Sequence, residues 1–170
     1  MNSTQEILDR YNGYLTRNKK LGLYNKNNSN EFWGNIESHY TDLLFLGKYS
    51  NKDLSFFDVG CGSGQTLDFA KSLGFHKVSG LEIDKTLYEE CLKNGFDVIN
   101  ENVITSKLDF LKNFDIIYFY CFIKEEDLQK KVLKNICNNM KVGAIIKVKL
   151  VKFDFENFVE VNRGEYKKIK

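Results

Sequence analysis

Residues 56–64 read Phe-Phe-Asp-Val-Gly-Cys-Gly-Ser-Gly. The apolar run that ends at Val59 is typical of a buried strand, and the helical spacing of Leu67, Ala70 and Leu73 begins directly after the glycines. Alternate glycines suit a backbone that turns sharply and leaves room for a ligand against the main chain. The helix that follows offers unpaired N–H groups to a polar or negative group. The pattern therefore predicts a strand, a tight turn and a helix around a bound ligand.

This stretch resembles motif I of the class I, Rossmann-like, S-adenosylmethionine-dependent methyltransferases, in its D-x-G-C-G-x-G form. The resemblance implies cofactor contacts from Asp58, Gly60, Cys61, Gly62 and Gly64. The dinucleotide-binding fingerprint is the nearest alternative, but it needs its third glycine one residue later, where this chain has Gln65. A glycine-rich turn without any ligand is the plainer alternative, and it leaves the buried strand before the glycines unexplained.

The composition predicts one cytoplasmic domain. With 170 residues the chain can bury a sizeable core, and its net charge of +2 gives no sign of a nucleic-acid or acidic membrane partner. The longest apolar runs, near residues 116–123 and 144–151, are shorter than the ~20 residues that cross a bilayer. No secretory leader is recognisable at the start. The cysteines and histidines lack metal-ligand spacing, so we expect no metal site.

A second strand is predicted at residues 77–84, and it ends in acidic side chains. Glu82 follows Gly60 at about the 20-residue spacing at which an acid on the next strand tip holds ribose hydroxyls. A carboxylate suits this role because it accepts hydrogen bonds from both hydroxyls. The methyltransferases share this feature, which implies that Glu82 and its neighbour Ile83 contact the cofactor. Asp84 is expected to cap the next helix.

A third strand, at residues 96–99, leads into Asn102 and Val103. The family commonly has an acid or an amide at this point, in contact with the adenine amino group. The resemblance therefore implies that Asn102 accepts that hydrogen bond and that Val103 is an apolar neighbour of the ring. Placement in a polar loop would also explain the asparagine.

The apolar strand predicted at residues 114–123 resembles motif IV of the family, whose exit borders the methyl group and the substrate. Tyr118 and Phe119 are therefore candidate cofactor contacts. Tyr120 is the candidate catalytic residue, because it could orient a nucleophile or shield the sulfonium. Aromatic residues in a buried strand are equally typical of a core. The chain lacks the Asp/Asn-Pro-Pro-aromatic sequence of enzymes that methylate adenine amines, which counts against methylation of nucleic-acid bases.

The rest of the pattern completes an α/β fold, a three-layer sandwich with a doubly wound, mostly parallel sheet. The last parallel strand is predicted at residues 141–146 and an antiparallel hairpin around Asn162–Gly164. The helix that the family usually has between them is expected to be shortened or lost.

A single methyltransferase-like domain is predicted over residues 1–170. Within it, residues 1–50 form a helical segment or lid, with a helix at 31–48. Residues 54–151 form the cofactor-binding core, and residues 152–170 form the terminal hairpin.

The resemblance predicts transfer of a methyl group from S-adenosylmethionine to an unidentified acceptor, a small molecule or a protein side chain, with a partner protein as one route to recognition. The sulfonium already activates the methyl group, so the protein mainly orients and dehydrates the nucleophile. Two alternatives stay open. One is a non-catalytic module that binds S-adenosylmethionine and regulates a partner. The other is a relative of the aminopropyl transferases, which carry an acid where this chain has Tyr120.

Overall fold

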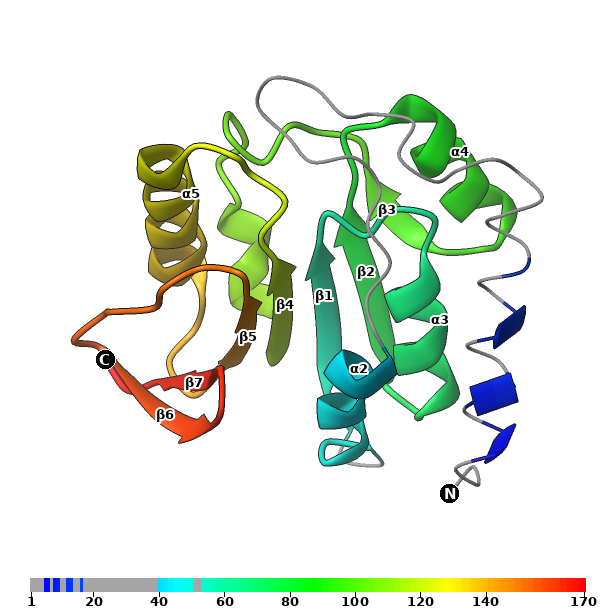
Figure 1. Ribbon diagram of the computed structural model, residues 1–170, viewed down its shortest axis with the longest axis horizontal. Helices are drawn as coiled ribbons and strands as arrows, with labels where there is room; N and C mark the ends of the chain where they lie inside the picture. Colours follow the sequence, from blue (N-terminus) through cyan, green and yellow to red (C-terminus); the bar gives the residue numbers. More distant parts are fainter. Residues whose placement is uncertain (1–4, 7, 10–11, 14–15, 17–39, 51–52) are drawn as a thin grey trace.

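A computed structural model describes residues 5–6, 8–9, 12–13, 16, 40–50 and 53–170. Its centre is a seven-stranded sheet with the order β3-β2-β1-β4-β5-β7-β6 (Figure 1). The strands are β1 Ser55–Val59, β2 Lys77–Leu81, β3 Asp97–Ile99, β4 Ile116–Tyr120, β5 Ile145–Lys149, β6 Phe158–Asn162 and β7 Glu165–Lys168.

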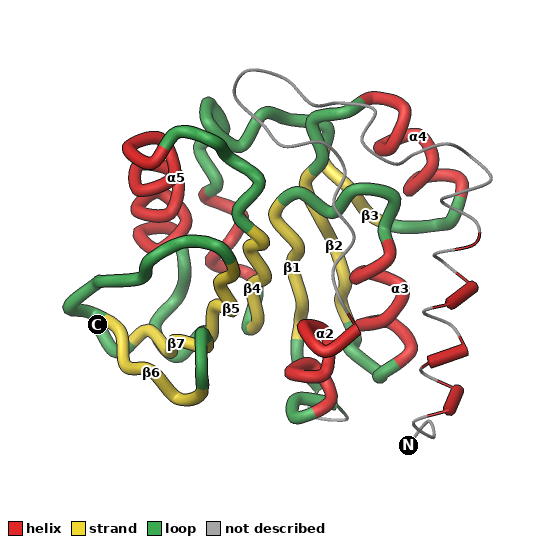
Figure 2. Tube along the Cα trace, in the orientation of Figure 1, coloured by secondary structure: helices red, strands yellow, loops and turns green. Residues whose placement is uncertain are grey.

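Helices cover both faces of this sheet (Figure 2). They are α2 Tyr40–Gly47, α3 Gln65–Ser72, α4 Lys85–Lys93, the short 3-10 helix η1 Asp109–Asn113, and α5 Glu126–Asn139. Side chains of α2, α3 and α4 share one core cluster, and those of η1 and α5 share the other. The predicted three-layer α/β sandwich is confirmed.

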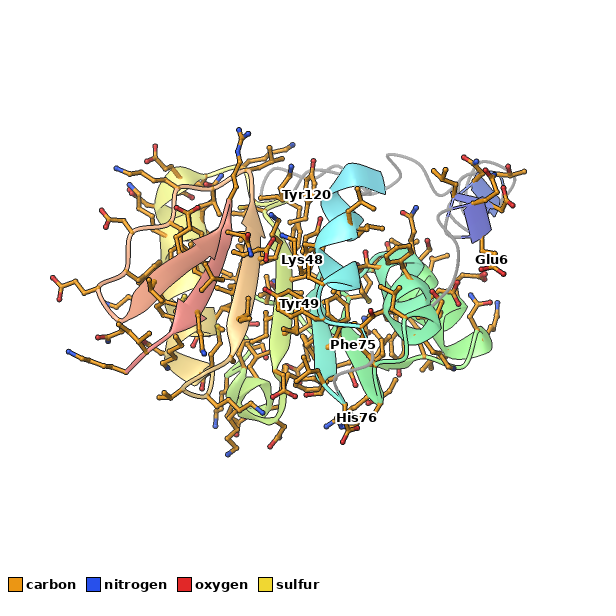
Figure 3. The ribbon with its side chains drawn as sticks, turned by 90° about the horizontal axis from the view of Figure 1, so that it is seen from below. Glu6, Lys48, Tyr49, Phe75, His76 and Tyr120 are labelled. Atoms are coloured by element: carbon orange, nitrogen blue, oxygen red, sulfur yellow. The ribbon has the colours of Figure 1, made fainter. Side chains whose placement is uncertain are left out.

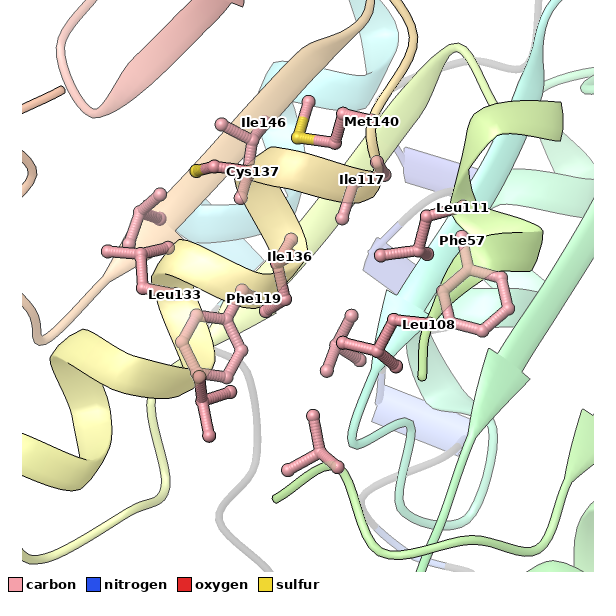
Figure 4. Packing of buried hydrophobic residues seen from close by; sticks show 14 of the residues in the cluster. Phe57, Leu108, Leu111, Ile117, Phe119, Leu133, Ile136, Cys137, Met140 and Ile146 are labelled. Carbon is pink, nitrogen blue, oxygen red and sulfur yellow. The ribbon is translucent and has the colours of Figure 1, made fainter. Parts of the chain in front are cut away.

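The two cores follow from the alternation of side chains along the central strands. Phe57, Ile117 and Phe119 face η1 and α5, where Leu133 and Ile136 meet them (Figure 4). Their neighbours Phe56, Ile116 and Tyr118 face α2 and α3. All five residues of β1 are buried, including the polar Ser55 and Asp58, because helices cover both faces of this central parallel strand.

The strand order determines where a ligand can bind. Strands β3, β2, β1, β4 and β5 are parallel, and the chain leaves β1 toward β2 on one side and returns to β4 on the other. In open sheets of this kind ligands bind beyond the carboxyl ends of the strands, where the order reverses. That point lies between the ends of β1 and β4.

The end of the chain differs from the prediction in one respect. The last parallel strand begins at Ile145, later than the predicted residues 141–146. Gly143 has a φ of 88°, and the Ala144 N–H donates to the Lys141 carbonyl at 3.2 Å, so a turn occupies the residues predicted to begin the strand. The predicted hairpin forms as β6 and β7, and residues 150–157 before it contain no helix. The loss of the last helix is thus confirmed.

The N-terminal segment is described only in part. Residues 40–47 of the helix predicted at 31–48 are helical as α2, and the rest of the predicted helix lies outside the described residues. The same holds for most of the predicted lid, residues 1–50. Within the described part of the chain, no helix has the length and apolar character needed to cross a bilayer.

Candidate cofactor site

The glycine loop after β1 has a backbone that only glycine adopts easily. Gly60, Gly62 and Gly64 have φ values of 88°, 56° and 86°. The N–H groups of Gly60 and Cys61 both donate to the Leu81 carbonyl, at 2.8 and 3.0 Å, so the loop is fastened to the end of β2. A side chain at these glycines would strain the turn that connects β1 to α3.

Glu82, just beyond β2, points its carboxylate at this loop. One carboxylate oxygen accepts from the Gly62 N–H at 2.8 Å and the other from the Asp84 N–H at 2.8 Å. Glu82 is only 7% exposed, and burial raises its pKa although hydrogen bonds from the backbone of Asp84, Gly62 and Ile83 favour the ionised form. A carboxylate has about four acceptor sites, so these backbone donors still leave capacity for a ribose hydroxyl.

The residues around Glu82 arrange the neighbouring strand ends. Asp84 caps α4 as predicted, since its carboxylate accepts from the Leu87 N–H at 2.9 Å. The Asn100 amide donates to the Glu82 carbonyl at 2.8 Å, which ties the exit of β3 to the exit of β2. Ile83 is 44% exposed, unusual for a large apolar side chain, and this leaves it available to pack against a base.

Asn102 lies at the edge of a cavity of about 430 Å³. The cavity is lined by Glu101, Asn102 and residues 105–110. The Asn102 side-chain oxygen accepts from the Ile104 N–H at 2.9 Å, which uses one of its two acceptor sites. Val103 is 2% exposed and belongs to the core on the α5 side. Its side chain is therefore enclosed by protein, and its predicted contact with the adenine ring stays a prediction.

Asp58 is buried in β1, with 3% exposure. Burial raises its pKa to about 8, the Thr66 hydroxyl bonded to it opposes the rise, and the charge of Glu82 adds to it. Through Thr66, Asp58 joins β1 to the first turn of α3. A direct contact between Asp58 and the cofactor stays a prediction.

The Cys61 side chain faces the protein. Its sulfur would lie only 2.8 Å from a Cβ placed on Gly80 of β2, and the pKa of its thiol is raised well above the usual range by hydrogen bonding with Cys91 and by burial. The Cys91 thiol in turn donates to the Gly62 carbonyl at 3.2 Å. The two cysteines therefore fill the space beneath the glycine loop, and a cofactor contact from Cys61 would come from its backbone.

The three aromatic residues predicted at the end of β4 have different surroundings. Tyr118 is 1% exposed and stacks on Phe45 of α2, with ring centroids 5.6 Å apart. Phe119 is fully buried in the core on the α5 side. These two side chains pack the core, so a contact between either of them and the cofactor stays a prediction. Tyr120 is half-buried at the carboxyl end of the strand and packs against the core on the α2 side, so its candidate catalytic role stays a prediction.

Phe122 is the site residue that the sequence analysis missed. A Cβ placed on Gly60 would overlap its ring, so the ring lies directly on the first glycine of the loop. It also meets Phe119 edge-to-face, with centroids 5.9 Å apart. Because Gly60 follows β1 and Phe122 follows β4, this contact lies at the reversal of strand order. Phe122 falls within the last residues of the strand predicted at 114–123, and an aromatic residue at that exit was the available signal.

A buried carboxylate at the tip of β2 and an exposed apolar side chain beside it could hold the sugar and the base of a nucleoside. The lining of the cavity at Asn102 includes neither Glu82 nor the glycine loop. The described residues hold no group of three or more His, Cys, Asp or Glu side chains able to bind a metal ion.

Comparisons with known proteins agree with this geometry. The family model described as "Methionine biosynthesis protein MetW" matches residues 41–160. The ribosomal protein L11 methyltransferase of Thermosipho melanesiensis is 32% identical over 129 residues, which is 71% of this chain and 49% of that protein. The chain thus spans about half the length of this curated relative.

Solved structures share the fold. A Haemophilus influenzae protein classed as a methylase superposes with a TM-score of 0.57 at 25% identity, covering 76% of this chain and 96% of its own. An RNA methyltransferase of Salinibacter ruber, in complex with S-adenosyl-L-homocysteine, gives a TM-score of 0.54 at 13% identity, with 77% and 90% covered. S-adenosylhomocysteine, which that structure contains, is the demethylated form of S-adenosylmethionine. The chain belongs to the MetW family, within the class I S-adenosylmethionine-dependent methyltransferases.

Proposed function

We propose that this protein transfers a methyl group from S-adenosylmethionine to an amine or hydroxyl of a small molecule or a protein side chain. The observation that carries this proposal is the hydrogen bond of 2.8 Å between Glu82 and the Gly62 N–H. It places a buried carboxylate at the tip of β2 against the glycine loop at the tip of β1, which is where the ribose of a nucleoside is held in this class of sheet.

Each strand end has a part in the proposed site. Glu82 accepts from the ribose hydroxyls, Ile83 and Asn102 contact the base, and the backbone of the glycine loop holds the amino-acid part. The bound cofactor supplies a methyl group that is already activated by its sulfonium. The Phe122 ring covers Gly60 and excludes water from it. The half-buried Tyr120, at the carboxyl end of β4, orients the incoming nucleophile.

The chemical class of the methyl acceptor is supported less directly than the binding of the cofactor. The family description refers to methionine biosynthesis, which favours a small metabolite, whereas the curated relative is named for a ribosomal protein. Neither description refers to a nucleic-acid base as the methyl acceptor. This agrees with the absence of the Asp/Asn-Pro-Pro-aromatic sequence from this chain. The chain covers only about half of the curated relative, so features of that relative outside the matched half do not carry over.

Tritiated S-adenosylmethionine tests the proposal directly. We expect the protein to pass label from the methyl group to cell extract, in either the small-molecule or the protein fraction. Glu82→Ala should abolish labelling because the ribose loses its acceptor, while Glu89→Gln, an exposed acid on α4, should label normally. If the protein binds the cofactor but neither fraction is labelled, the proposed methyl transfer is wrong. The protein would then be a regulatory module that binds the cofactor without catalysis.

A further inference from the structure

Two polar side chains are neighbours where β4 and β5 end. Tyr120 is the last residue of β4, Lys149 is the last residue of β5, and the two are direct partners in the parallel register. Neighbouring strands of a sheet are about 4.8 Å apart. Both residues are half-buried, so part of each is accessible to a ligand. Lys149 is therefore a cross-strand neighbour of the residue that orients the nucleophile in the proposed function.

Lys149 lies on the same face of the sheet as Tyr120. Tyr120 packs against the core on the α2 side. On β5, Ile146 belongs to the opposite core, whereas the Lys147 ammonium lies 5.7 Å from the centre of the Phe45 ring of α2. Because side chains alternate along a strand, Lys149 shares the α2 face with Lys147. A ligand at this edge of the α2 face therefore meets Tyr120 and Lys149 together.

The charges along this face of β5 become more positive toward its carboxyl end. Lys147 is the register partner of Glu165 in β7 and lies 3.8 Å from its carboxylate. The same register continued to Lys149 reaches Arg163, in the turn between β6 and β7. This turn lies against β5, since the Lys147 ammonium donates to the Arg163 carbonyl at 2.7 Å. An acid thus accompanies the inner lysine, whereas the residue level with the outer lysine is a second cation, and this favours an anion at the edge.

The residue directly after Lys149 has a strained backbone. Leu150 has a φ of 61° and is 63% exposed. A positive φ is unfavourable for a large side chain, and backbone strain of this kind is concentrated at ligand sites and switch regions. The Lys149 carbonyl just before it accepts from the Cys121 N–H at 3.0 Å, which joins the exits of β4 and β5. The strained, exposed leucine is a second and independent indication that a ligand binds at this edge.

We propose that Lys149 binds an acid group, a carboxylate or a phosphate, of a small-molecule methyl acceptor while Tyr120 orients the amine or hydroxyl nucleophile of the same molecule. The inference rests on the proposed function and narrows its acceptor. Because the two side chains come from adjacent strands, the acid group lies only a few bonds from the nucleophile.

The transfer leaves the acid group of the acceptor unchanged. A lone pair of the nucleophile forms the new bond to the methyl carbon while the bond between that carbon and the sulfur breaks. The sulfonium becomes a neutral thioether, and the nucleophile releases its proton to water. The methylated product therefore keeps the negative charge that Lys149 binds.

Methyl-labelled S-adenosylmethionine and the small-molecule fraction of a cell extract test this proposal. The native protein should give a labelled product that a strong anion exchanger retains at pH 12, where amines are neutral and acid groups are charged. Lys149→Gln should lower the initial rate about ten- to a hundred-fold at low extract concentration, the range expected for a hydrogen bond to a charged group. The loss should be smaller at high extract concentration, because the substitution weakens binding of the acceptor. Lys149→Arg keeps the positive charge and should retain most of the rate.

Two controls separate acceptor binding from other effects. Lys134→Gln removes an exposed lysine of α5 and should label at the native rate. Calorimetry with S-adenosylhomocysteine should give Kd values for Lys149→Gln and the native protein that agree within about two-fold, because Lys149 contacts the acceptor. The same measurement shows that the variant is folded.

Failure of the inference differs from failure of the proposed function. A labelled product that the exchanger does not retain, label confined to the protein fraction, or equal rates of Lys149→Gln and the native protein would overturn the assignment to Lys149 and leave methyl transfer intact. Loss of S-adenosylhomocysteine binding in Lys149→Gln would also overturn it. If the native protein labels neither fraction, the proposed function itself is wrong, and the inference fails with it.

Discussion

Asp58 and Glu82 are two carboxyl groups buried beside the same glycine loop, with exposures of 3% and 7%. Burial raises the pKa of both, and for Asp58 the value is about 8. Burial is the largest cause of both shifts, and the charge of Glu82 adds to the shift of Asp58. Such a site favours a cationic ligand, since a nearby positive charge stabilises the ionised carboxylates. S-adenosylmethionine carries both a sulfonium and an ammonium group.

The raised pKa of Asp58 makes the stability of the unliganded protein depend on pH. Between about pH 4 and pH 8 the unfolded chain has lost this proton and the folded chain keeps it, so the free energy of unfolding falls as pH rises, by about 1.4 kcal/mol per pH unit from this group. Asp58→Asn cannot ionise, and we expect it to flatten the dependence. Urea unfolding at pH 5, 6, 7 and 8 measures this. Asp109→Asn, at an exposed acid, is the control, and an unchanged slope in Asp58→Asn would contradict the prediction.

Phe122 and Gly60 are in contact, although no single sequence motif contains both residues. The ring lies on the glycine at the point where the strand order reverses. A methyl group in transit needs an enclosed, dry space, and an aromatic face also attracts a sulfonium. The glycine is needed here both for its positive φ and for the space that the ring occupies.

At the scale of elements, a buried acid joins α2 to the terminal hairpin. Glu165 of β7 is 1% exposed and accepts from the Lys48 ammonium and the Tyr49 hydroxyl, both at 2.9 Å. Lys48 and Tyr49 follow α2, more than a hundred residues earlier in the chain, and both are labelled beside that helix in Figure 3. Lys147 of β5 lies 3.8 Å from the same carboxylate. Burial and the bond to Glu165 raise the pKa of Tyr49, which keeps it a donor.

Glu165→Ala should lower the free energy of unfolding by about 3 kcal/mol, because it removes the buried carboxylate that accepts from the Lys48 ammonium and the Tyr49 hydroxyl. Chemical denaturation followed by circular dichroism measures the loss. Glu156→Gln removes an exposed carboxylate from the connection between β5 and β6 and should change stability by less than about 0.5 kcal/mol. Equal stabilities of the two variants would show that the cluster does not hold the elements together.

At the scale of the whole molecule, the proposed ligand contacts the ends of four strands at once. Cofactor binding should therefore resist global unfolding. At a concentration of S-adenosylhomocysteine a hundred times its Kd, we expect about 2.7 kcal/mol of stabilisation, which for a chain of 170 residues raises Tm by about 5–10 °C. NAD at the same concentration should leave Tm unchanged, because Gln65 replaces the third glycine of the dinucleotide fingerprint. A larger shift with NAD than with S-adenosylhomocysteine would contradict the cofactor assignment.

The sequence alone determined the sheet, the helices on its faces and the glycine loop. Those features depend on local patterns, an apolar run of strand length, a helical repeat and a required positive φ, and each of these is readable within a few residues. It also located Glu82 and the cap at Asp84, since both follow from spacing along one strand and one helix start. The start of β5 was predicted too early, because the apolar pattern does not reveal the turn at Gly143.

Only the tertiary structure decided which side chains face the ligand. Tyr118 and Phe119 are adjacent in sequence, yet they pack into opposite cores, while Phe122, outside the predicted set, lies on Gly60. The buried Glu165 cluster is likewise invisible in the sequence. The physical reason is that burial and hydrogen-bond partners depend on segments 60 or more residues apart coming together, and one-dimensional patterns do not encode those distances.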